Sequence, residues 1–146
     1  MPVRSGKLLV TDPCYERCLR GRLWCNAVVE DVLPHEAYQV RHCFEKYNFV
    51  SLSVYHPDYI NAIPDEIAHD DIGVDSATIS LSDVEHKFPL SGLHGHSEVV
   101  DWHGSKVAAV TCDDGGYILL VARNEEDKIV AVEVLDPPLE ENEEEE

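Results

Sequence analysis

The fold is decided by residues 106–135, which read KVAAVTCDDGGYILLVARNEEDKIVAVEVL. Three apolar runs rich in β-branched residues are separated there by the polar segments DDGG and NEED. Asp-Gly is typical of a tight hairpin turn that needs positive φ. Residues 106–112, 117–123 and 128–135 are therefore predicted to form a three-stranded antiparallel meander, whose middle strand is interior.

The segments before this stretch show the same strand signal. Residues 23–30, 38–44 and 50–54 alternate between apolar and polar side chains, which indicates strands with one buried face. Residues 7–11 and 78–81 are short apolar runs that fit two further strands. Six to eight short strands are thus expected along the chain.

Helix signals are few. Residues 13–19 fit a turn or two of helix, and residues 82–85 have the spacing of a capping box that Pro89 soon ends. The sequence therefore predicts a mainly β fold, an antiparallel sandwich or half-barrel that ends in the meander, with at most one or two short helices.

The apolar content of the chain is enough for one core. Residues 1–137 are predicted to form a single β-rich domain, and six glutamates after Pro137-Pro138 predict a disordered acidic tail over residues 138–146. The first residues lack the apolar run of a signal peptide, and no apolar stretch is long enough to cross a bilayer. Five cysteines are an odd number that a secreted chain cannot fully pair. These features predict a soluble protein of the cytoplasm.

Negative charge is concentrated in the second part of the chain. The net charge is -18, yet residues 1–46 hold seven Lys/Arg against six Asp/Glu, whereas residues 47–139 hold four against seventeen. Charge of this size attracts basic surfaces and repels phosphate. The predicted partner is therefore a basic protein surface, without direct nucleic-acid or membrane binding, and the oligomeric state is left open.

Residues 56–71 interrupt the strand pattern with two prolines and five carboxylates. Such a composition predicts a long surface excursion, and long loops on a rigid sheet are frequent binding sites. The predicted partner-binding residues are the carboxylates of this excursion and nearby aromatic side chains: Asp58, Asp65, Glu66, Asp70, Asp71, Tyr55, Tyr59 and Trp102.

The sequence contains no nucleophile elbow, phosphate loop, dinucleotide fingerprint or complete metal-ligand signature. The favoured hypothesis is a non-enzymatic acidic binding protein without a cofactor, whose attraction to its partner weakens as salt rises. One form of this hypothesis is an inhibitor that presents carboxylates where a nuclease or replication factor normally holds nucleic-acid phosphates.

Histidines support an alternative from a different class. His94 and His96 would point the same way in an extended chain, and His103 follows seven residues later. With a carboxylate from Asp75 or Asp114, three imidazoles can bind a divalent metal such as zinc and leave a position for water. This arrangement would make the protein a small metal-dependent hydrolase or ligand-binding enzyme. Surface histidines in a glycine-containing loop are the simpler interpretation of the same residues.

Three further motifs are Asp12-Pro13-Cys14-Tyr15, Gly73-Val74-Asp75-Ser76 and Asp114-Gly115-Gly116-Tyr117. They resemble the Asp-Pro-x-Tyr, Gly-Val-Asp-Ser-Gly and Gly-Asp-Gly-x-Tyr motifs of a family of uncharacterised small bacterial and phage proteins. The chain departs from that pattern at Ala77, which replaces the central glycine, and in the spacing of the third motif. The resemblance covers about half of the chain. It implies a β-rich fold and a microbial or phage setting, where an inhibitor would act in the host cytoplasm.

The three motifs carry Asp12, Asp75 and Asp114. One interpretation has these carboxylates converge at one end of the sheet as acid/base groups or metal ligands. The other has Asp12 and Asp75 accept backbone hydrogen bonds in turns, which is the usual role of aspartate next to proline or glycine. We favour the second interpretation.

Overall fold

The computed structural model describes residues 1–12, 26–46, 48–74, 78–85, 99–102, 105–112 and 115–136. Within these ranges the chain forms strands and one short 3-10 helix, η2 (Pro57–Tyr59). The strands are β1 (Leu8–Thr11), β2 (Asn26–Val29), β3 (Gln39–Glu45), β4 (Asn48–Tyr55), β5 (Glu66–Val74), β6 (Thr78–Asp83), β7 (Val99–Trp102), β8 (Ser105–Thr111), β9 (Gly115–Arg123) and β10 (Ile129–Leu135).

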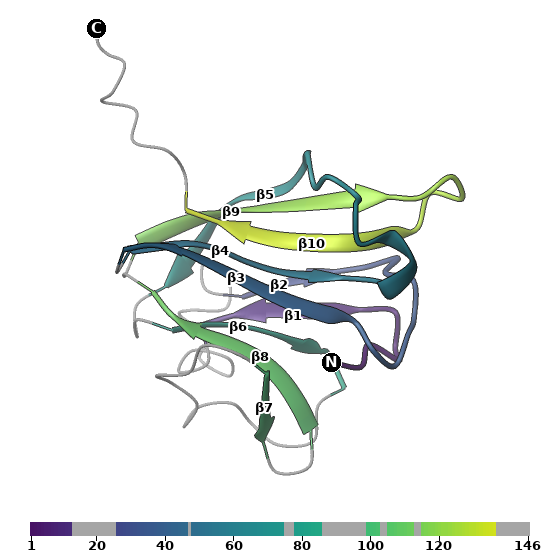
Figure 1. The fold of residues 1–146 in the computed structure, drawn as a ribbon, viewed down its shortest axis with the longest axis horizontal. Helices are drawn as coiled ribbons and strands as arrows, with labels where there is room; N and C mark the ends of the chain where they lie inside the picture. The colour runs from purple at the N-terminus through teal and green to yellow at the C-terminus, as the bar shows by residue number, and fades with distance from the viewer. Residues whose placement is uncertain are drawn as a thin grey trace, which may run out of the picture.

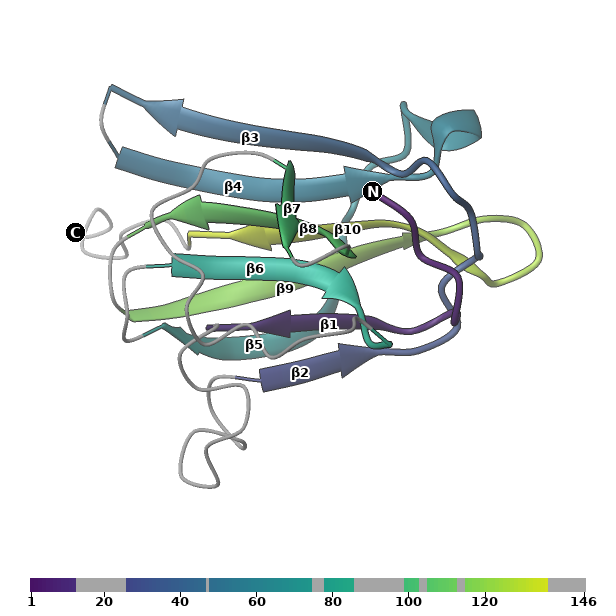
Figure 2. The same ribbon diagram turned by 90° about the horizontal axis from the view of Figure 1, so that it is seen from below.

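The strands form two antiparallel sheets that lie face to face (Figures 1 and 2). The first sheet has the order β2-β1-β6-β8-β7, and the second sheet has the order β3-β4-β10-β9-β5. The predicted β-sandwich is thereby confirmed. In the second sheet, β10 is the last strand along the described chain, yet it lies between β4 and β9.

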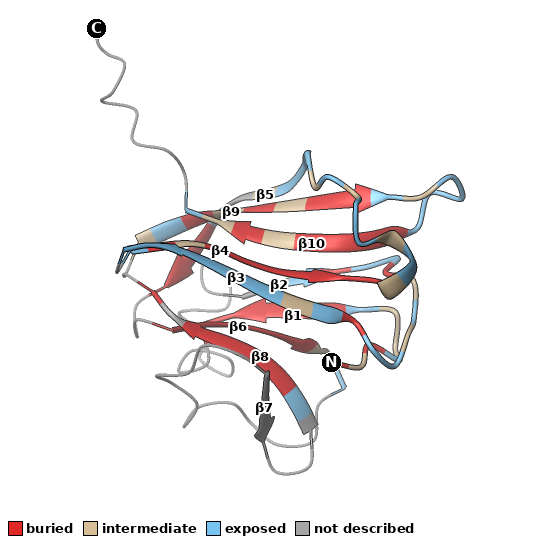
Figure 3. Ribbon diagram, in the orientation of Figure 1, coloured by how far each residue is buried: buried red, intermediate tan, exposed pale blue. Residues whose placement is uncertain are grey.

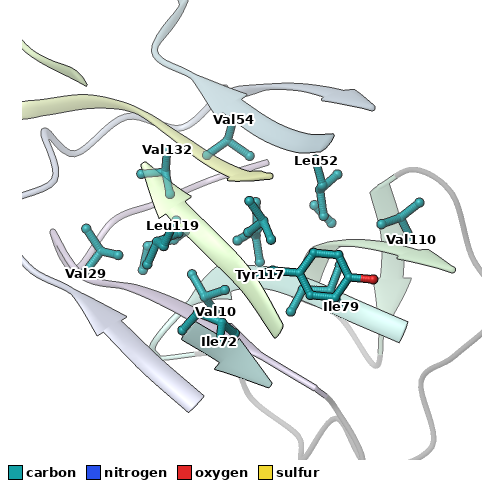
Figure 4. Packing of buried hydrophobic residues seen from close by; sticks show 14 of the residues in the cluster. Val10, Val29, Leu52, Val54, Ile72, Ile79, Val110, Tyr117, Leu119 and Val132 are labelled. Carbon is teal, nitrogen blue, oxygen red and sulfur yellow. The ribbon is translucent and has the colours of Figure 1, made fainter. Parts of the chain in front are cut away.

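The hydrophobic core lies between the two sheets (Figure 4). Alternate residues of β1, β4, β6, β9 and β10 point into it, as the two-residue period of a strand requires. The fully buried side chains include Leu8, Val10, Ile79 and Leu81 from the first sheet, and Leu52, Val54, Leu119, Val121 and Val132 from the second. One cluster therefore joins both sheets.

The predicted three-stranded meander is wrong in one pairing. β9 and β10 do form a hairpin, but β8 pairs with β6 and β7 in the first sheet. Val74 of β5 pairs with Gly115 of β9, and Thr78 of β6 pairs with Thr111 of β8. The chain thus passes from one sheet to the other twice at the same corner, once from β5 to β6 and once from β8 to β9. The Asp-Gly pattern does not distinguish such a corner from a hairpin turn.

Strand β3 also differs from its prediction. The alternation in residues 38–44 predicts a buried face, but every residue of β3 is exposed except the half-buried Val40, because β3 is the edge of the second sheet. On the neighbouring strand β4, the register shifts so that Phe49, and not Val50, occupies the core position. The extra residue of this bulge belongs to β4, and β3 itself stays regular.

The predicted excursion is shorter than expected. Residues 66–71 belong to β5, which pairs with β9 along the other edge of the second sheet. The register of β5 shifts between Ile67 and His69 and again between His69 and Ile72. These irregularities remove the alternation that identifies a strand in the sequence, so only residues 56–65 remain outside regular strands.

The predicted capping box at residues 82–85 does not start a helix. Ser82 and Asp83 end β6, and the Asp83 carboxylate accepts hydrogen bonds from the Ser5 hydroxyl at 2.6 Å and the Glu85 amide at 2.9 Å. Burial alone would raise the pKa of Asp83, but these hydrogen bonds outweigh it and lower the pKa below 3.8. Asp83 therefore fastens the loop before β1 to the end of β6.

Candidate functional site

Exposed carboxylates gather at one end of the sandwich, where the β9–β10 turn and η2 lie (Figure 1). We call this region the acidic end and define it by Asp31, Asp58, Asp65, Glu66, Glu125, Glu126 and Asp127, all of which are exposed. Backbone hydrogen bonds bring the separate segments together: the Ile129 amide donates to the Asp31 carbonyl at 2.8 Å, and the His56 amide donates to the Val130 carbonyl at 2.8 Å. Arg123, Lys128 and Arg41 stand among these carboxylates, which outnumber them.

His56 holds the start of the excursion. Its ring is buried against His35, Tyr38 and Tyr59, with centroid distances of 4.6, 5.6 and 5.3 Å. Its Nδ1 accepts the Asp58 amide hydrogen at 3.1 Å and so caps η2. The hydrogen bond makes Nδ1 an acceptor, which places the ring hydrogen of the neutral imidazole on Nε2.

Two further contacts fix the rest of the excursion. The Arg41 guanidinium lies over the Tyr55 ring, 4.1 Å from its centroid, and its Nη2 donates to the Ile60 carbonyl at 3.1 Å. Asn124 Nδ2 donates to the Tyr59 hydroxyl at 3.4 Å and links η2 to the β9–β10 turn. The loop is therefore tied to β3, to β10 and to the β9–β10 turn.

Arg123 is the cation most closely engaged at the acidic end. Its Nε donates to Glu66 Oε1 at 2.9 Å and lies 3.9 Å from Asp127 Oδ1. The hydrogen bond that Arg123 donates to Glu66 is the main reason that the pKa of Arg123 is raised above its ordinary value. A single exposed guanidinium shared between two carboxylates leaves the surrounding charge negative, and such pairs contribute little to stability.

Apolar side chains lie in the same stretch of chain as these carboxylates, on the loop and at the start of β5. Ile60, Ile63 and Ile67 have exposed fractions of 39, 75 and 61%, and they are three of the five large apolar side chains that are exposed in the described part of the chain. Figure 3 shows the excursion and the β9–β10 turn largely in the colour of exposed residues. Clustered exposed isoleucines next to charged groups are typical of an interaction surface.

The protonation of His56 is unfavourable in the folded protein. Burial lowers the pKa of its imidazole, the nearby His35 lowers it further, and Asp58 acts in the opposite direction. Protonation would also place a hydrogen on Nδ1 and remove the acceptor that caps η2. Acid is therefore expected to loosen the excursion.

The free energy of unfolding should fall when the pH is lowered from about 7.5 to about 5.5. The unfolded chain binds a proton at His56 near pH 6.5, the ordinary value, whereas the folded chain does so only at lower pH. The contribution of His56 to the free energy of unfolding is thus complete above pH 6.5 and is lost as the pH falls, by at most about 1.4 kcal/mol per pH unit. His56→Asn should reduce this slope, because an asparagine oxygen accepts the Asp58 amide without titrating. Urea denaturation of both proteins at several pH values measures the slope of the free energy of unfolding against pH.

His69 offers a matched control for this measurement. Its Nδ1 accepts the Asp71 amide at 3.2 Å, the same local arrangement, but its side chain is only half-buried. His69→Asn makes the same exchange at a less buried ring and should change the slope less than His56→Asn does. An equal loss of slope in both variants would show that His56 has no special part in the pH dependence.

The structure brings only some of the predicted partner-binding residues together. Asp58, Asp65 and Glu66 lie at the acidic end, but Asp71 lies farther along β5, next to Ile72, which pairs four positions along β9 from the partner of Glu66, roughly 13 Å at the usual rise of a strand. Asp70 belongs to β5 and Trp102 to β7, but their side chains lie outside the described part. The aromatic residues differ in access: Tyr59 is half-buried, whereas Tyr55 is only 7% exposed beneath Arg41 and has little surface to offer a partner.

The isoleucines were missed by the sequence analysis, although a signal existed. Ile60 and Ile63 stand in a segment flanked by Pro57 and Pro64 that has no periodicity. Apolar residues without periodicity in such a segment cannot share a buried face, which favours exposure.

The predicted metal ligands His94, His96 and His103 lie outside the described residues, as do Asp75 and Asp114. Asp12 is described and fully buried directly after β1, where the Thr11 hydroxyl donates to its carbonyl oxygen at 3.0 Å. Within the ranges that the structure covers, no group of three or more His, Cys, Asp or Glu side chains is placed to hold a metal ion.

Comparison with family models, curated proteins and solved structures finds no match to this chain. The resemblance to small bacterial and phage proteins therefore stays a prediction. Among the described residues, no helix is long and apolar enough to span a membrane.

Proposed function

We propose that this protein is a non-enzymatic binding protein that docks its acidic end onto a basic surface of another protein. The observation that carries the proposal is the exposure of Ile60 and Ile63 on the loop and of Ile67 at the start of β5, next to exposed carboxylates in the same stretch of chain. The carboxylates attract and orient a cationic partner, and burial of the isoleucines supplies affinity of about 25 cal/mol per Å² of apolar surface removed from water.

The contacts that hold the loop support this proposal. An unstructured loop loses conformational entropy when it binds, whereas a loop already fixed by His56, Arg41 and Tyr59 loses less. The same contacts hold the loop outside the core, so the exposed surface of the isoleucines adds no hydrophobic burial to the folded state. A surface that exposes apolar groups in a fixed arrangement is best explained by a partner that covers them.

The excess of exposed carboxylates at the acidic end suits a partner whose basic surface normally holds nucleic acid. A protein that carries carboxylates in place of phosphates would compete for such a surface and act as an inhibitor. This form of the proposal follows from the charge and from the resemblance to phage proteins.

The test is capture of partners from a lysate of expressing cells by the immobilised protein, compared at about 50 and 500 mM salt. A basic polypeptide should be retained at the lower salt and released at the higher one. Retention that is equal at both salt concentrations, or no retained basic polypeptide, would refute the proposal. Added duplex DNA should displace the partner if the inhibitor form is right. Failure of DNA to compete would remove that form and leave docking intact.

A further inference from the structure

The free edge of β3 is unusually open. Within the described residue ranges β3 pairs with β4 alone, and Figure 2 shows it on the outer edge of the second sheet. Its side chains are exposed, Phe44 among them at 37%. Natural edge strands are commonly protected by prolines or by bulges of their own, but β3 has neither over its seven residues.

The local charge allows a second copy to approach there. The whole chain carries a net charge of -18, which keeps copies apart over most of their surface. Around β3, however, Arg41 and Lys46 accompany the single carboxylate Glu45. The net charge of these three residues is only +1, so two copies meet at this edge with little like-charge repulsion.

The sequence of β3 is complementary to itself. In a twofold antiparallel pairing, the numbers of opposite residues have a constant sum, and opposite side chains lie on the same face of the sheet. When Cys43 lies on the twofold axis, Arg41 stands opposite Glu45 of the second copy, and His42 stands opposite Phe44 of the second copy. Both charged residues of β3 then face a residue of opposite charge, and the twofold axis generates two such Arg41–Glu45 pairs in the dimer.

Other registers lose this match. Centring the pairing on Arg41 places Arg41 opposite itself, and centring it on Glu45 places Glu45 opposite itself. Registers centred on His42 or Phe44 leave Arg41 without a carboxylate opposite. Like charges directly opposite destabilise a strand pair, so the register centred on Cys43 is the favoured one.

We propose that two copies of this chain associate through β3 in this register and form one continuous sheet across both molecules. The proposal does not rest on the proposed function: dimerisation uses the edge of β3, docking uses the acidic end, and of the paired residues Arg41 also contacts the loop there whereas Glu45 does not define it. The salt responses also differ: docking to a basic partner weakens with salt, whereas self-association of two negative chains strengthens when salt screens their overall repulsion.

Sedimentation of the purified chain over a concentration series, with charge exchange at the paired positions, tests the proposal. Arg41→Glu and Glu45→Arg should each weaken dimerisation by about tenfold or more, because each places two like-charge pairs in the interface. The double variant Arg41→Glu/Glu45→Arg should restore it. Glu45→Arg is the cleaner single change, since Arg41 also contacts Tyr55 and Ile60. Unfolding midpoints check that each variant is folded.

A second readout uses Cys43, which is an exposed free thiol. Opposite residues in an antiparallel pair have Cα atoms about 4.5–5.5 Å apart, within the range that a disulfide spans. Diamide should link the two Cys43 thiols, accepting their two electrons and two protons, and the linked peptide is identified by mass spectrometry. A chain that stays monomeric at all concentrations, single variants that dimerise like the wild type, or linkage only through other cysteines would overturn the proposal.

Discussion

Replacing Leu119 by alanine is expected to lower the free energy of unfolding by about 2 to 5 kcal/mol. Leu119 is 1% exposed, and Figure 4 shows it among the core side chains contributed by both sheets. It lies on β9 opposite Val134 of β10 and His69 of β5. Because the backbone of β9 is paired with a strand on each side, these strands cannot move to fill the cavity that the substitution leaves. A loss of this size is a large share of the stability of a typical domain. Urea denaturation measures it from the shift of the midpoint.

Leu120 provides the control within the same strand. It differs from Leu119 by one position, points to the outer face of the second sheet and is only half-buried. Leu120→Ala should therefore cost clearly less than Leu119→Ala. Equal costs would mean that the outer face of β9 is packed as tightly as the core, which would contradict the arrangement of the two sheets.

Exchanging charge at the acidic end should have the largest effect on binding. The double variant Asp65→Lys/Glu126→Lys is expected to weaken binding to the basic partner captured by the wild-type protein by about tenfold or more at low salt. Both side chains are exposed, so folding should be unaffected. The dissociation constant, measured by titration of the purified partner, gives the effect, and its salt dependence should be shallower than that of the wild type.

Two further variants separate general charge from position. Asp71→Lys changes an exposed carboxylate of β5 that lies away from the acidic end, and it should leave the dissociation constant within about twofold of the wild type. Ile63→Ala keeps the charge and removes an apolar side chain that is 75% exposed. It should weaken binding by about tenfold without loss of stability. If Asp71→Lys weakens binding as much as the double variant, the attraction depends on total charge and the docking site is elsewhere.

The strands were predictable where alternation is clean and one face meets the core. Residues 7–11 and 78–81 predict β1 and β6 closely, and the NEED segment predicts the β9–β10 hairpin. Prediction is poorer at bulges, because one extra residue reverses the alternation, as at Val50 in β4 and in the irregular part of β5. The passage of β5–β6 and β8–β9 between sheets depends on contacts distant in sequence, which no local pattern records.

The site was predictable in its charge and not in its apolar part. Composition alone indicates an excursion with carboxylates, and Asp58, Asp65 and Glu66 do lie together. The contributions of Glu125, Glu126 and Asp127 come from a turn more than fifty residues later in the chain. Only the pairing of β5 with β9 brings that turn beside Glu66. The sequence therefore indicates the kind of partner, and the topology supplies the surface.

The central position of β10 has a consequence for how the chain is made. During synthesis the ribosome releases residues in order, so β4 is complete more than seventy residues before β10, the strand that must insert between β4 and β9, whereas β9 precedes β10 by only a short turn. Until residues 129–135 emerge, each of these strands has an open edge with apolar side chains in water, a state prone to aggregation. Completion of the second sheet is therefore a late event. A nascent chain that stalls before β10 is synthesised would need a chaperone to prevent its aggregation.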